Sequence, residues 1–226
     1  MSEEKEKIVN QAEEMKKETK ETAKQVKDSV KNVNIKDETK KTKGFIKEMF
    51  KNPINKLQEI SKDGDSFFKT AIFIIIIWII AVFIKSTYST IYYWGFSRVF
   101  SNFLTTLKNI LVPILSILVY SVIIFALNKE NKKGLPSIIS VVTATKFPAV
   151  LASVVSLLTL FSHEITKLTI AFTNLCGVLT IVLSYFGYKA LFAESDDNKF
   201  IKKFAIIEIV YCVVYVILTF LGIYIY

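Results

Sequence analysis

The sequence predicts an all-α polytopic membrane protein with five transmembrane helices, in-plane amphipathic helices and a charged N-terminal tail. Two observations predict this fold class. Hydrophobic residues make up 52% of the 226-residue chain and charged residues 22%, a more apolar balance than a globular domain shows. The charges are also concentrated, because residues 1–69 hold 17 of the 29 basic and 14 of the 20 acidic side chains. The remainder of the chain is therefore compatible with lipid.

Five apolar stretches are long enough to cross the hydrocarbon core, which takes about 20 residues. We expect these spans at about 67–84, 110–127, 147–162, 168–191 and 204–226. Together they form a membrane domain over residues 67–226. The stretch around residues 73–80 is almost entirely isoleucine, and a helix without a polar face is suited to lipid.

The loop lysines and the aromatic residues predict the orientation. Basic residues of the short loops are more frequent on the side that carries the N-terminus, and such loops stay in the cytoplasm. The sequence therefore predicts a multi-pass protein of the cell membrane with a cytoplasmic N-terminus and an external C-terminus. Aromatic residues are expected at the outer interface, after the first span at Tyr88, Tyr92, Tyr93 and Trp94 and at the end of the fifth at Tyr224 and Tyr226.

Residues 1–43 form the charged tail. A weak apolar spacing over 5–33 is typical of a helix, although Ala and Thr occupy positions where a stable coiled coil has Leu or Ile. Two interpretations remain open: a helix that binds a protein partner or the membrane surface, and a solvated, partly disordered segment. Residues 34–44 have the composition of a linker.

Residues 44–66 predict a juxtamembrane amphipathic segment. Two short apolar patches lie on either side of Pro53, and lysines flank both. Such a segment next to a span is suited to binding anionic lipid headgroups. A second amphipathic pattern covers 96–108 and predicts an in-plane helix that lies on the outer interface or packs on the bundle.

The apolar run from 135 to 161 is too long for one upright span, because 27 helical residues measure about 40 Å and the hydrocarbon core about 30 Å. Pro148 cannot donate a hydrogen bond to the carbonyl of Ala144, so a kink is expected there. We predict an interfacial helix over about 136–146 and a crossing that begins near Phe147. At this interfacial break Lys146 would extend its side chain to the membrane surface.

The sequence offers little for catalysis. Its single histidine, His163, lies beside Glu164, and one such pair does not make a metal site. Nucleotide-binding glycine loops and nucleophile motifs are absent from the sequence. The tail mixes acids with its lysines, which does not favour binding to nucleic acid. We expect no enzyme activity, no cofactor and no metal.

Polar residues inside spans are the remaining candidates, because they are costly there and often functional. Glu208 lies in the fifth span, where it could serve a proton or cation relay or pair with Lys202 and Lys203 at the interface. Asn174 belongs to a line of small residues in the fourth span, which favours close helix packing but could also line a cavity.

Several of these features resemble the Yip-type membrane family of Ypt/Rab-interacting proteins and their bacterial relatives. The resemblance covers roughly residues 45–226. It depends on the Asn52–Pro53 pair before the first span, on GLPSIISVVTATKFPAVL with Pro148, and on NLCGVLTIVLSYFGYKALF with Gly187. It implies a five-helix membrane domain and, for eukaryotic members, adaptor roles in vesicle traffic with small GTPases.

The leading hypothesis is therefore a non-enzymatic scaffold, adaptor or membrane-organising protein. Its expected partners are the lipid bilayer, through anionic headgroups at the basic juxtamembrane segment, and a protein bound by the N-terminal tail. The alternative is a small transporter, permease subunit or channel that uses polar intramembrane residues.

Overall fold

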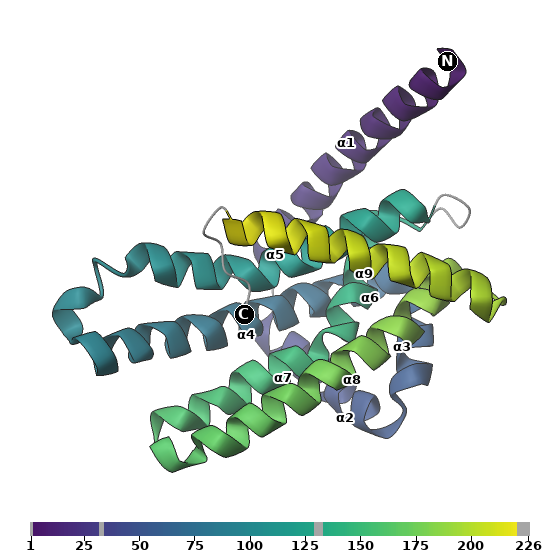
Figure 1. Ribbon diagram of the computed structural model, residues 1–226. Coiled ribbons are helices and arrows are strands. Elements are labelled where there is room, and N and C mark those ends of the chain that lie inside the picture. Colours follow the sequence, from purple (N-terminus) through teal and green to yellow (C-terminus); the bar gives the residue numbers. More distant parts are fainter. Residues whose placement is uncertain (1, 32–33, 129–132, 221–226) are drawn as a thin grey trace.

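The computed structural model describes residues 2–31, 34–128 and 133–220. All regular structure within these ranges is helical, without a β-strand, which confirms the predicted all-α class. Four helices are long and apolar enough to cross a membrane: α4 (Gly64–Trp94), α5 (Phe103–Leu127), α8 (Thr166–Phe192) and α9 (Asp197–Phe220). The chain is a multi-pass membrane protein (Figure 1). Residues 221–226, with Tyr224 and Tyr226 at the predicted end of the last span, lie outside the described ranges.

A fifth crossing is formed if two bent helices count as one. α6 (Leu135–Thr145) is followed by α7 (Phe147–Val155) and a 3-10 turn, η2 (Ser156–Leu160), and the two parts meet at 48°. The bend falls at Lys146, where the sequence predicts a break. The chain thus has four or five spans, depending on whether this bent pair crosses completely.

Two helical hairpins end on the same side of the molecule (Figure 1). The α4–α5 hairpin is closed by the segment around η1 (Phe96–Arg98), and the α7–α8 hairpin by η3 (His163–Ile165). The hydroxyl of Tyr88 in α4 donates a hydrogen bond to the carbonyl of Leu160 at 3.0 Å. We call this side the loop end of the molecule.

The in-plane helix predicted over 96–108 is wrong as a single element. The chain turns between η1 and α5, and the residues from Phe103 onward already belong to α5. Gly95 ends α4 with φ of +79°, a conformation that glycine adopts at low cost. Phe96 and Phe100 are largely exposed, so the apolar side chains of this segment are not used in packing on the bundle.

The linker predicted over 34–44 is also wrong, because α2 (Ile35–Lys51) runs through it. Asn34 caps this helix by accepting a hydrogen bond from the backbone N–H of Lys36 at 3.2 Å. The buried face of α2 follows a seven-residue repeat made by Glu38, Thr42, Phe45 and Met49. Two of these four residues are polar, which hid the helical period from an analysis of apolar residues alone. The boundary predicted at residues 43 and 44 therefore lies inside a helix.

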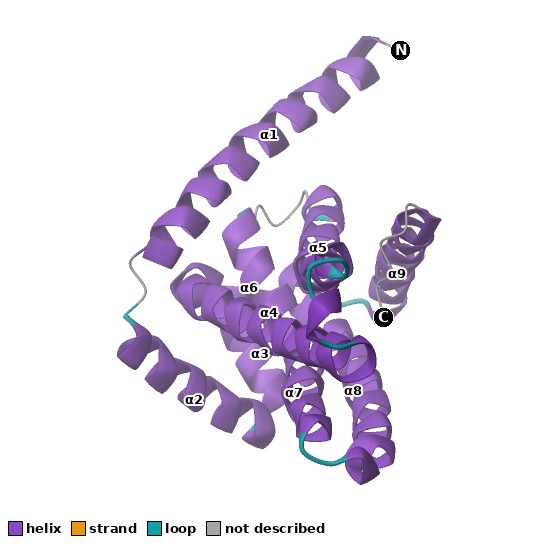
Figure 2. Ribbon diagram, turned by 90° about the vertical axis from the view of Figure 1, so that its left-hand side faces the viewer, coloured by secondary structure: helices purple, strands orange, loops and turns teal. Residues whose placement is uncertain are grey.

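The tail begins with a 30-residue helix, α1 (Ser2–Lys31). Its N-terminal part extends away from the other helices (Figures 1 and 2). Its second half contacts the bundle, because Thr22 and Ser29 are buried and the backbone N–H of Leu135 donates to the carboxylate of Glu18 at 3.2 Å. The described residues of the tail are thus helical.

α6 lies at the centre of the fold, between α4, α5, α8 and α3 (Pro53–Lys62). Every residue of α6 except Pro136 is buried. The prediction of an interfacial helix over about 136–146 is therefore wrong, because this helix is enclosed by protein. Its polar residues bond inward instead: the hydroxyl of Ser140 donates to the carbonyl of Gly64 at 2.7 Å. Protein surrounds this helix on all sides.

Two glycines permit the close packing around α6. A Cβ atom at Gly64 would lie 2.7 Å from the Cα of Ser137, and one at Gly187 would lie 2.5 Å from the Cγ2 of Thr145. Both distances are shorter than carbon atoms tolerate. α4 and α8 therefore approach α6 more closely than any larger residue would allow.

Candidate functional site

The break between α6 and α7 places a lysine inside the protein. Pro148 is the second residue of α7, where a missing N–H costs no helical bond, so α7 can start in a new direction. Lys146 at the break is only 8% exposed. Its ammonium lies 3.9 Å from the ring centroid of Tyr120 in α5. The side chain expected to reach the membrane surface is instead enclosed, because an aromatic face is available to it.

The same tyrosine binds the carboxylate of the last span. The hydroxyl of Tyr120 donates a hydrogen bond to Oε2 of Glu208 at 2.9 Å. The predicted partner Lys203 forms its ion pair elsewhere, with Glu194 at 3.1 Å, and Lys202 is exposed. Pairing of Glu208 with these two lysines is therefore not observed.

Two further tyrosines complete the arrangement. The ring of Tyr211 stacks on that of Tyr120 with centroids 4.1 Å apart, and the centroid of Tyr188 lies 5.9 Å away. The ammonium of Lys146 is also 6.0 Å from the Tyr211 ring. We call Lys146, Glu208 and these three tyrosines the tyrosine–charge cluster. It joins α5, α8, α9 and the α6–α7 break.

The cluster compensates two charges that would be costly alone. An unpaired ion in a low-dielectric interior is expensive, and a cation over an aromatic ring gains about 0.5–2 kcal/mol. Tyr120 serves both charges, since its face contacts the ammonium and its hydroxyl the carboxylate. Chemically, the arrangement holds four elements together and neutralises its own charges. Neither of the two cavities described below is lined by Lys146 or Glu208.

Asn174 is not part of this cluster. It is exposed on α8, and the line of small residues to which it belongs divides in two. Thr180, Ser184 and Gly187 are buried, whereas Ala171 and Asn174 are exposed. α8 thus packs tightly near its C-terminus and separates from its neighbours toward the loop end.

Sequence reasoning missed Tyr120 and Tyr188. Tyrosine in a span is most frequent at the two interfaces, but Tyr120 lies 17 residues into the 25-residue α5, within an apolar run. That placement, together with Lys146 and Glu208 in other spans, was the available signal. A polar aromatic residue and two opposite charges at membrane depth are expected to contact one another in the folded bundle.

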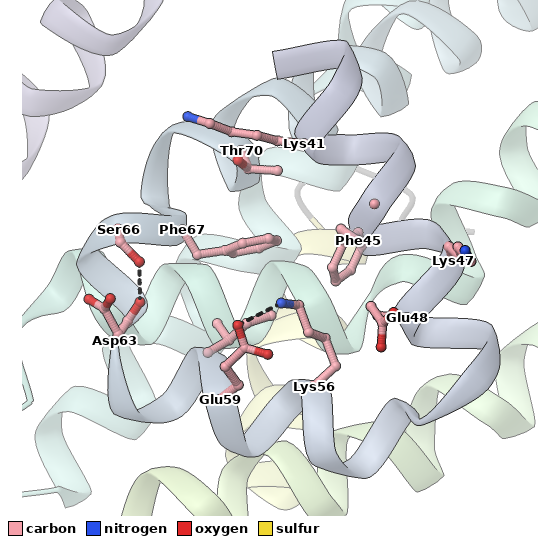
Figure 3. Close-up of a pocket in the computed structure, with 12 residues that line it drawn as sticks. Lys41, Phe45, Lys47, Glu48, Lys56, Glu59, Asp63, Ser66, Phe67 and Thr70 are labelled. Atoms are coloured by element: carbon pink, nitrogen blue, oxygen red, sulfur yellow. Dashed lines mark hydrogen bonds and ion pairs between the residues drawn. The ribbon is translucent and has the colours of Figure 1, made fainter. Parts of the chain in front are cut away.

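The juxtamembrane segment contains a separate cavity of about 450 Å³ between α2, α3 and α4 (Figure 3). Phe45 and Phe67 lie across it with ring centroids 5.1 Å apart. Lys56 and Glu59 form an ion pair of 2.8 Å at its edge. Three lysines and three acidic residues line this cavity: Lys41, Lys47, Lys56, Glu48, Glu59 and Asp63. The charge of its lining is therefore balanced.

Comparison with known proteins adds no family to this description. No protein-family model, no curated protein and no solved structure matches the chain. Within the described ranges, no group of three or more His, Cys, Asp or Glu residues has the geometry to hold a metal ion.

Proposed function

We propose that the chain is a membrane scaffold or adaptor that holds a protein partner through α1. On this proposal it acts without catalysis, in the cell membrane, with the N-terminus in the cytoplasm and the C-terminus outside. The observation that carries the proposal is the geometry of α1: a long charged helix whose second half contacts the bundle and whose N-terminal part extends away from the other helices.

The attachment of α1 supports a binding role. The anchoring contacts involve Glu18, Thr22 and the partly buried Val26, which packs against the core. Lys20 and Lys24 of the same helix are exposed. A helix that is fixed at one end and displays charge along its length offers a partner a preorganised surface.

The exposed side of α2 supports membrane attachment beside that partner. Phe50 is 71% exposed and Ile54 at the start of α3 is 38% exposed, while Lys47 and Lys51 next to them are exposed as well. Apolar side chains flanked by lysines can enter a headgroup layer while the ammonium groups contact anionic lipid.

A Yip-type relationship remains part of the proposal. The positions that carry the resemblance coincide with structural joints: Asn52 and Pro53 separate α2 from α3, Pro148 opens α7 and Gly187 faces α6. These roles are consistent with a five-helix domain of that kind, in which an adaptor function is expected.

The experiment is cross-linking with mass spectrometry in native membranes. A Lys20→Glu/Lys24→Glu variant should lose most of the cross-linked partner, because the charge that α1 presents is reversed. The matched control is Lys199→Glu/Lys202→Glu, which reverses two exposed lysines of α9 and should keep the partner. Equal partner recovery from both variants would refute binding through α1.

Transport is the second candidate, because Lys146 and Glu208 are charged residues at membrane depth. If Glu208 carried protons or cations, Glu208→Gln would abolish ion-driven uptake into proteoliposomes. The scaffold proposal predicts no uptake in the unmodified chain and unchanged partner cross-linking in Glu208→Gln. Uptake that disappears with this substitution would favour the transporter.

A further inference from the structure

A second and larger cavity lies between the two hairpins, with a volume of about 770 Å³. Helices α4 and α5 form one wall, and α7, η2 and α8 form the other. The hairpins separate toward the loop end (Figure 1), where α8 leaves its neighbours. We call this cavity the hairpin groove. Its volume falls within the range of about 300–1,000 Å³ that is usual for small-molecule sites.

The groove has an apolar end. The indole N–H of Trp78 donates to the hydroxyl of Ser153 at 2.8 Å, which satisfies the polar atoms of both side chains. The other lining residues at this depth are small or apolar: Val82, Val112, Pro113, Ala149, Ala152 and Gly177. A Cβ atom at Gly177 would have no neighbour within 4 Å. This end offers space and apolar walls for a hydrocarbon chain.

The other end of the groove is polar and basic. Lys85 from α4 and Lys108 from α5 both line it. Asn109 donates a hydrogen bond to the hydroxyl of Ser86 at 3.0 Å and so fixes the two helices together at this level. Beyond the lysines, Tyr93 and Trp94 form the rim, and such aromatic residues lie at headgroup depth in a membrane.

The two lysines have no acidic partner in the described part of the chain. Neither forms an ion pair there, and the sequence contains no Asp or Glu from residue 66 to residue 127. No acidic residue lines the groove. Two ammonium groups at the edge of the membrane therefore favour an anion between the hairpins.

The dimensions match one lipid molecule. From Trp78 to Trp94 the groove follows α4 for 16 residues, which is about 24 Å of helix. Half of the hydrocarbon core is about 15 Å thick, so the groove extends from the middle of the bilayer to the headgroups of one leaflet. A soluble anion would leave the apolar end unfilled, whereas an acyl chain would occupy it.

We propose that the hairpin groove binds a phospholipid with an anionic headgroup, with its phosphate at Lys85 and Lys108 and an acyl chain along Trp78 and Gly177. This site lies in the leaflet at the loop end, away from the juxtamembrane helices α2 and α3. It does not depend on the proposed scaffold function.

The chain contains its own probe, because both of its tryptophans, Trp78 and Trp94, line the groove. In a Trp94→Phe background, only Trp78 emits, and it is 8% exposed. Its quenching by brominated acyl chains therefore reports a chain inside the groove. The full chain is reconstituted in vesicles that contain brominated phosphatidylglycerol or brominated phosphatidylcholine.

We expect phosphatidylglycerol to quench Trp78 at lower mole fraction than phosphatidylcholine. Lys85→Gln/Lys108→Gln should reduce this preference by about tenfold, and Lys167→Gln, an exposed lysine at the same end, should preserve it. Gly177→Leu should reduce quenching by both lipids, while Ala171→Leu on the exposed part of α8 should not.

Four results would overturn the proposal. The first is equal quenching of Trp78 by the two lipids in the parent chain. The second is a preference for phosphatidylglycerol that survives the double lysine substitution, and the third is a preference that Lys167→Gln reduces as much as that double substitution does. The fourth is quenching that Gly177→Leu leaves unchanged. Soluble glycerol phosphate distinguishes the remaining source of phosphate. If millimolar glycerol phosphate abolishes the lysine-dependent preference for phosphatidylglycerol, the groove is a site for a small phosphate and not for a lipid.

Discussion

The helices α6 and α9 are both apolar, but the fold uses them in opposite ways. All of α6 except Pro136 is buried, whereas Phe200 and Ile207 are the only buried residues in the described part of α9. Figure 2 shows α6 among the other helices and α9 at the side of the bundle. Hydrophobicity alone therefore does not determine which apolar helix forms the core of a membrane protein.

The difference lies in how each helix is held. The position of α6 depends on close packing, since glycines on α4 and α8 let these helices approach it closely. α9 depends on specific contacts, namely the bond from Tyr120 to Glu208 and the packing of Phe200 against Tyr185 at 5.1 Å. Lipid is as apolar as a leucine side chain, so burial of apolar surface gives little advantage inside a bilayer.

The largest effect is expected from overfilling the α6–α8 contact. Gly187→Val would force a side chain against Thr145 and Val141, because its Cβ atom would lie 2.5 Å from the Cγ2 of Thr145 and 3.2 Å from the Cγ1 of Val141. We expect a loss of about 3 kcal/mol, measured by thermal unfolding in detergent. Gly177→Val on the same helix has open space and should cost far less. Equal losses would mean that α8 does not approach α6 at Gly187.

The next effect concerns α9. Glu208→Gln removes the charge that the hydroxyl of Tyr120 binds and leaves Lys146 buried with less compensation, for an expected cost of about 2 kcal/mol. Hydrogen exchange should show the opening of α9 increased more than that of α6. Lys202→Gln, an exposed charge on the same helix, is the control and should change neither.

A double-mutant cycle sharpens this result. Tyr120→Phe removes the hydroxyl but keeps the ring that faces Lys146. Because Tyr120→Phe removes the hydrogen bond that Glu208→Gln weakens, the loss in Tyr120→Phe/Glu208→Gln should be smaller than the sum of the two single losses. Additive losses would mean that the two side chains act independently.

A smaller effect is expected from one hydrogen bond of α6. Ser140→Ala removes the bond from its hydroxyl to the carbonyl of Gly64 and should cost about 1 kcal/mol of unfolding free energy. Ser101→Ala, an exposed serine with a local bond to the carbonyl of Arg98, should be close to neutral. A larger loss at Ser101 would contradict the central position of α6.

The smallest effect is expected at the start of α9. The hydrogen bond from Lys203 lowers the pKa of the Glu194 carboxyl below its ordinary value of 4.5. A lowered folded-state pKa adds stability that is present above pH 4.5 and lost as the pH falls through the folded-state value. Lys203→Gln should therefore lower the melting temperature slightly at pH 7 and not at all at strongly acidic pH. A difference that grows on acidification would contradict this pair.

The sequence predicted the apolar helices α4, α5, α8 and α9 but not the contacts between them. Long apolar runs such as α4 and α5 can be recognised as transmembrane helices from the sequence, because their length and composition are enough to identify them. Composition failed over 34–44, because the burial of Glu38 depends on the folded context. The hydroxyl of Thr70 donates a hydrogen bond to the carboxylate of Glu38 at 2.9 Å. These residues are 32 positions apart, so the local sequence around Glu38 does not predict the contact.

The candidate site was predicted in part. Glu208, Lys146 and Pro148 were recognised as unusual for a span, and the chain does bend at Lys146. Their arrangement could not be foreseen, because a lysine at a helix break can turn toward water or toward an aromatic ring. The decision depends on Tyr120, which approaches from another helix.

The most direct test of this account is the accessibility of residue 146. In a chain with Cys176 and Cys212 replaced by Ala, Lys146→Cys and Lys202→Cys are each treated with a membrane-impermeant maleimide on inside-out and right-side-out vesicles. The enclosed position of Lys146 predicts that Cys at 202 reacts from one side and that Cys at 146 reacts from neither until the protein is unfolded. Rapid labelling at position 146 in the folded protein would contradict the enclosed tyrosine–charge cluster. It would instead support the sequence-based prediction that Lys146 lies at the membrane interface.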